Sequence, residues 1–117
     1  FELRLMDGSA NPYLLQAGVI AAGLDGINNK SDPGEALTCN MYTDYKNYPN
    51  LKKLPNEIED ALYELNNSKK LKESFGEDVI NSYLKLKNKE IDEFNRSERF
   101  DKKLPVTDLE KNNTLDC

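Results

Sequence analysis

Two charged side chains at the start of the chain, Glu2 and Arg4, are of types, and at a spacing, that could form part of a binding or catalytic site. A carboxylate is a hard oxygen ligand for a divalent cation, and a guanidinium binds carboxylate or phosphate groups. In a strand, residues two apart lie on one face, so both groups would point the same way. The alternative is an ordinary exposed ion pair, which the spacing alone favours.

The hydrophobic pattern predicts the elements that would position this pair. Residues 1–6, FELRLM, include apolar residues that alternate with Glu2 and Arg4, and this alternation predicts a half-buried strand over about 1–6. After a turn, Asn11 supplies an N-cap and Pro12 a first helical residue with preset φ. A helix is therefore expected over about 12–25, with Asp25-Gly26 as its stop.

The body of this first helix, Tyr13–Leu24, contains no charged residue. A helix that is apolar or small around its whole circumference is typical of one buried on all sides. Gly18 and Gly23 would then allow close approach of neighbouring elements. The run is too short and too interrupted to span the roughly 20 residues of a bilayer, so no membrane attachment is expected.

Amphipathic patterns predict further helices downstream, over about 56–66, 68–74 and 77–95, and a short last one over about 106–111. Asp32-Pro33-Gly34 predicts a turn between the first helix and the rest. The expected fold class is mainly α, an N-terminal β-strand followed by a buried helix and several amphipathic helices, in one domain over 1–117.

Composition excludes several classes of function. The 117 residues are 38% hydrophobic and 32% charged, as in globular proteins, and the net charge of −5 argues against a nucleic-acid surface. There is no histidine, and Cys39 and Cys117 do not form a metal-type pair, so a zinc site is not expected. A reduced, cytoplasmic protein is the simplest interpretation.

Three blocks of sequence, taken in order, resemble the carboxy-terminal part of glutamine synthetases. They are Glu-Leu-Arg at 2–4, Asp-Gly-Ser-Ala-Asn-Pro-Tyr-Leu at 7–14, and Ala-Ala-Gly-Leu-Asp-Gly-Ile at 21–27. A loop with Asn29, Lys30, Pro33, Gly34 and Glu35 extends the resemblance, which continues more weakly to the long helix. It implies the carboxy-terminal portion of an α+β glutamine synthetase catalytic domain.

By this resemblance, Glu2 falls on a metal-binding glutamate and Arg4 on an arginine that binds substrate carboxylate or phosphate. The implied reaction activates the side chain of glutamate with ATP as γ-glutamyl phosphate, which ammonia or a small amine then attacks. Mg²⁺ or Mn²⁺ and ATP would bind to the intact enzyme. The 117-residue chain is expected to bind none of them tightly and to be inactive alone.

The resemblance also bears on regulation, assembly and the amine. Tyr42 falls where many bacterial members carry an adenylylated tyrosine, but Leu-Pro-Pro does not follow it here, so an unmodified loop tyrosine is favoured. Asn11, Pro12 and Tyr13 are interpreted as structural, with Tyr13 in the packing shell of the helix. A homo-oligomer is expected. The tail from Asp101 resembles divergent branches that include γ-glutamylmethylamide synthetases, which leaves the amine open.

A different class of function, a free-standing helical interaction module, remains as an alternative. Its lone strand would need a partner, because unpaired strand edges expose backbone polar groups. The reading frame upstream of Phe1 separates the two hypotheses: continuous synthetase-like sequence supports the enzyme, and a start codon or an unrelated domain supports the module.

Overall fold

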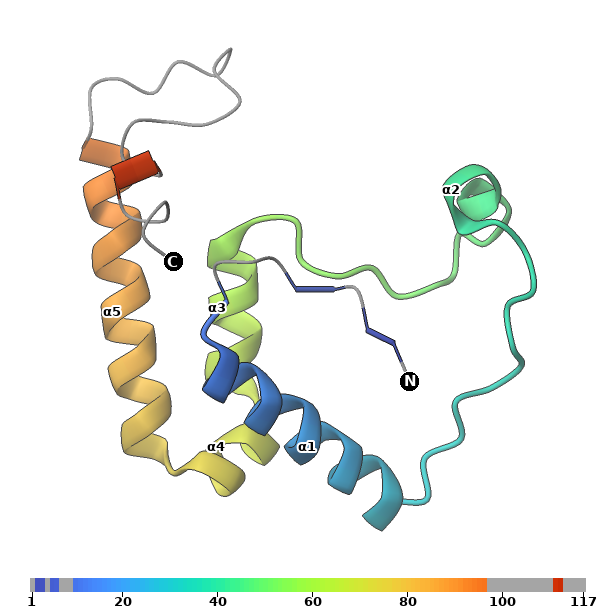
Figure 1. The fold of residues 1–117 in the computed structure, drawn as a ribbon, viewed down its shortest axis with the longest axis horizontal. Coiled ribbons are helices and arrows are strands. Elements are labelled where there is room, and N and C mark those ends of the chain that lie inside the picture. The colour runs from blue at the N-terminus through green and yellow to red at the C-terminus, as the bar shows by residue number, and fades with distance from the viewer. Residues whose placement is uncertain (1, 4, 7–9, 97–110, 113–117) are drawn as a thin grey trace.

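The structure is a computed structural model that describes residues 2–3, 5–6, 10–96 and 111–112. The elements, in chain order, are α1 (Pro12–Asn28), α2 (Met41–Asp44), the 3₁₀ helix η1 (Tyr45–Asn47), α3 (Ile58–Asn67), α4 (Lys69–Phe75) and α5 (Glu77–Arg96). Figure 1 shows α3, α4 and α5 as a connected unit, with α1 crossing beside α4 and α2 set apart.

Helix α1 begins where the capping signal predicts. The Asn11 side chain accepts hydrogen bonds from the backbone N–H groups of Tyr13 and Leu14, at 3.0 and 3.1 Å. Pro12 occupies the first helical position, where its missing N–H costs nothing. The structural interpretation of Asn11 and Pro12 is therefore confirmed.

The end of α1 corrects the predicted stop at Asp25-Gly26, because the helix continues to Asn28. The N–H of Ser31 bonds to the carbonyl of Gly26 at 2.9 Å, and that of Lys30 to the carbonyl of Ile27 at 3.1 Å. This pattern is a Schellman motif, and its left-handed position is Lys30, with φ of 51°. A lysine therefore stands where glycine is usually found.

The downstream helices have local start and stop signals. Ser68 separates α3 from α4 and caps α4, its hydroxyl oxygen accepting from the N–H of Leu71 at 3.3 Å. Gly76, with φ of 85°, separates α4 from α5. The predicted turn is present, since the Asp32 carboxylate accepts from the N–H of Gly34 at 2.9 Å. The helix expected over about 106–111 lies outside the described residues except for Lys111, which is helical.

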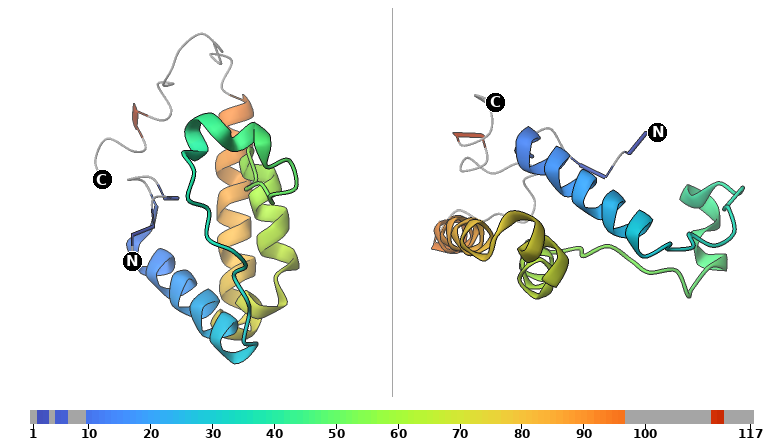
Figure 2. Two further views of the ribbon diagram at one scale, coloured as in Figure 1. Left: turned by 90° about the vertical axis from the view of Figure 1, so that its right-hand side faces the viewer. Right: turned by 90° about the horizontal axis from the view of Figure 1, so that it is seen from below.

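The buried core of the described residues is small. Leu62 of α3 and Ile80 of α5 are its buried hydrophobic side chains, where these two helices pack together. Figure 2 shows α3 and α5 side by side, with α1 inclined to both. Helix α4 contacts α5 on one side and α1 on the other, so it joins α1 to the rest.

The strand predicted over about 1–6 is not confirmed. The structure assigns no strand to residues 2–3 and 5–6, and residues 1 and 4 lie outside the described part. A strand exists through hydrogen bonds to a neighbouring strand, and the described residues contain none. Within the described part of the chain, the alternating segment therefore has no partner strand.

The expectation that α1 is buried on all sides is wrong for this chain. None of its residues is buried, and Tyr13, Ile20 and Ile27 are 82%, 61% and 74% exposed. A Cβ added to Gly18 or Gly23 would meet no described atom within 4 Å, so the expected close approach is absent. The physical reason is that α4 contacts one side of α1, while the opposite side has nothing against it in the described part.

The arrangement is correspondingly open. The radius of gyration is 17.2 Å, whereas a compact domain of 100 residues has about 13 Å. Figure 1 and the right-hand view of Figure 2 show α2 and η1 away from α3, α4 and α5.

Replacing Lys30 with glycine should stabilise the chain. Lys30→Gly removes the steric cost of a side chain at positive φ and should raise the free energy of unfolding by about 0.5–1 kcal/mol, measured by urea denaturation. The matched control Lys85→Gly lies inside α5 and should lower it by about 1 kcal/mol. Destabilisation by both substitutions would show that the Schellman motif does not form.

Candidate functional site

The pair Glu2 and Arg4 is only partly described. Glu2 is exposed, and Arg4 lies outside the described residues. The structure therefore gives no distance between the carboxylate and the guanidinium, and their predicted roles remain predictions.

The segment that carries this pair is attached to α1 through the Asn11 cap. Because Asn11 binds two backbone N–H groups, the direction in which the chain enters α1 is set locally. The packing role expected for Tyr13 is wrong here, since this side chain is 82% exposed. The contribution of the Asn-Pro-Tyr turn is thus to begin helix α1, through the Asn11 cap and Pro12, and not to pack the Tyr13 side chain.

The described residues supply one part of a metal site at most. Among residues 2–3, 5–6, 10–96 and 111–112, no group of three or more histidine, cysteine, aspartate or glutamate side chains is close enough to hold a metal ion. The carboxylate of Glu2 has the hard oxygen atoms that Mg²⁺ prefers, but Mg²⁺ takes six ligands. A site that includes Glu2 must take its other ligands from elsewhere.

Tyr42 lies in α2, a helix of four residues, and is 91% exposed. Its backbone N–H donates to the Asn40 side chain at 3.1 Å, which begins the helix. An exposed phenol is open to a modifying enzyme, and it is equally what an ordinary loop tyrosine shows. The prediction for Tyr42 is therefore not tested by this geometry.

The segments on either side of Tyr42 contain a small hollow and a contact between two sulfur atoms. The hollow, about 220 Å³, is lined by the consecutive residues 47–51. Ligand pockets usually have about 300–1,000 Å³ and draw on several elements, so this hollow is not a substrate site. Nearby, the Cys39 thiol lies 3.6 Å from the Met41 sulfur, and its hydrogen bond with Tyr48 raises the pKa of that phenol.

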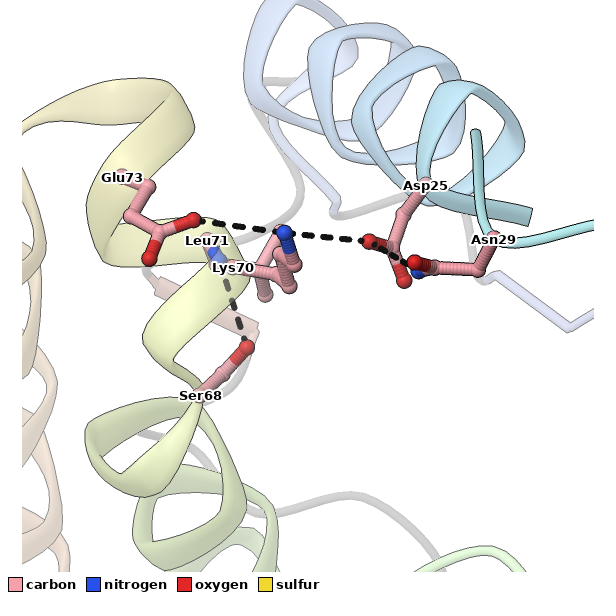
Figure 3. Close-up of polar contacts among 6 residues, drawn as sticks. All are labelled: Asp25, Asn29, Ser68, Lys70, Leu71 and Glu73. Carbon is pink, nitrogen blue, oxygen red and sulfur yellow. Dashed lines mark hydrogen bonds and ion pairs between the residues drawn. The ribbon is translucent and has the colours of Figure 1, made fainter. Parts of the chain in front are cut away.

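An ion-pair network between α1 and α4 was not predicted. Figure 3 shows the Lys70 ammonium between Glu73 and Asp25, at 3.4 and 3.5 Å. Asp25 also accepts a hydrogen bond from the Asn29 side chain at 2.9 Å. The spacing of Lys70 and Glu73 is visible in the sequence, but nothing local indicates a partner 45 positions earlier on another helix.

The charge of Lys70 is favoured by these partners. Glu73, and after it Asp25, raises the pKa of Lys70 above its ordinary value of 10.5. A raised pKa means that the pairing stabilises the fold below about pH 10.5 and is lost as the pH rises through the folded-state value. Both groups are substantially exposed, so salt screens the pair and its contribution is small.

None of the helices that the structure describes is long and apolar enough to cross a membrane.

Comparison with known proteins identifies the family. The profile described as glutamine synthetase, catalytic domain, matches residues 1–102. The glutamine synthetase of Rhizobium meliloti is 49% identical over 90 residues, which are 77% of this chain and 21% of that protein. The glutamine synthetase of Methanosarcina mazei is 40% identical over 96 residues, covering 80% of this chain and 22% of that protein.

A relative with a different name matches more of the chain. The glutamate–methylamine ligase of Methyloversatilis universalis is 36% identical over 119 residues, covering 98% of this chain and 25% of that protein. No solved structure shows a significant match.

The chain spans about a fifth of the length of these glutamine synthetase relatives. The catalytic-domain profile covers the Glu-Leu-Arg, Asn-Pro-Tyr and Gly-Leu-Asp-Gly blocks together, and with them α1 to α5. The resemblance drawn from those blocks is confirmed: the chain belongs to the glutamine synthetase family of ligases, as a carboxy-terminal part of one of its members.

Proposed function

We propose that this chain, over residues 1–117, is the carboxy-terminal part of the catalytic domain of an ATP-dependent glutamate–ammonia ligase. The reaction forms glutamine through γ-glutamyl phosphate. The observation that carries the proposal is the match of residues 1–102 to the catalytic-domain profile, together with 49% identity to a glutamine synthetase.

Glu2 and Arg4 are the residues of this chain that would serve the reaction. Mg²⁺ or Mn²⁺, when bound, would neutralise the charge of the phosphate groups. Glu2 would hold one such ion through its carboxylate, and the remaining ligands would come from other parts of the intact subunit. Arg4 would orient the carboxylate of glutamate or a phosphate, which suits a planar cation that stays protonated.

The intact protein would be located in the cytoplasm. Its substrates would be glutamate, ammonia or a small amine, and ATP. Identical subunits would be its partners in an oligomer. Tyr42 is a candidate modification site of lower rank, since its exposure fits both of its interpretations. The alternative of a non-catalytic helical module has less support, because the profile match covers residues 1–102 and runs through α1 to α5.

The purified 117-residue chain should have no ligase activity. The family resemblance gives this chain one candidate metal ligand, Glu2, and the residues that the structure describes contain no cluster of three metal-binding side chains, whereas phosphoryl transfer needs several charged groups around the phosphates. The measurement is formation of glutamine and ADP from glutamate, ammonia, ATP and Mg²⁺. Turnover that depends on both ATP and glutamate would contradict the proposal that the site lies mostly outside this chain.

In the intact subunit that contains this chain, Glu2→Gln should raise the Mg²⁺ concentration for half-maximal activity by about 10–100-fold. The substitution keeps the size of the side chain and removes its charge. The measurement is glutamine formation against Mg²⁺ concentration. Glu59→Gln, on the exposed first turn of α3, is the matched control and should leave the curve unchanged. An unaltered Mg²⁺ dependence for Glu2→Gln would remove this residue from the metal site.

A second candidate is a glutamate–methylamine ligase, because that relative covers 98% of the chain and thus includes its tail. The higher identity to glutamine synthetases favours ammonia. We therefore expect the intact subunit to have a kcat/KM for ammonia at least about tenfold above that for methylamine. The measurement is kcat/KM for ammonia and for methylamine by steady-state kinetics at fixed pH. A higher kcat/KM for methylamine would support the second candidate.

A further inference from the structure

We draw no further inference here: the strongest candidate, the side-chain cluster of Cys39, Met41 and Tyr48 around α2 and η1, is built on the one cysteine that the described residues contain, and its contacts lie within the cluster and point to no ligand.

Discussion

The arrangement of the helices depends on α4, because this seven-residue helix contacts both α1 and α5. Its two ends are specified by local chemistry, the Ser68 hydroxyl at the start and the positive φ of Gly76 after its last residue. These two features set the angles at which α3 and α5 leave α4. They therefore also determine where the charged end of Lys70 stands, and with it the contact to α1.

What holds α1 against α4 differs in kind from what holds α3 against α5. Leu62 and Ile80 are removed from water between α3 and α5, so this contact is hydrophobic. Helix α1 has no buried residue, and it is joined to α4 by an ion pair that salt weakens. The position of α1 is accordingly the part of the arrangement that is least supported by packing within the chain.

The elements with local signals could be predicted from the sequence, and the contacts between them could not. Asn11 and Pro12 place the start of α1 because capping involves neighbours in the chain. The end of α1 was missed, since a Schellman motif with lysine in the left-handed position gives no glycine to recognise. Burial of α1 was predicted from its composition, but burial requires partners that the described residues do not provide.

The candidate site shows the same division. The types of Glu2 and Arg4 and the blocks around them were sufficient to recognise the family, which the profile match confirms. Their geometry could not be predicted, because the strand expected to carry them would take its position from neighbouring strands. The Lys70–Asp25 ion pair could not be predicted from the sequence for a related reason. It joins residues 45 positions apart, and they meet only because of how α1 and α4 are oriented.

The local closure of both ends of α1 has a consequence for how this helix forms. Asn11 and the Schellman motif satisfy the terminal backbone groups of the helix without any tertiary partner. The boundaries of α1 are thus encoded separately from its surroundings. A helix of 17 residues is marginal in water without packing, so the caps define where α1 begins and ends as it forms, and contacts with other parts of the domain supply most of its stability.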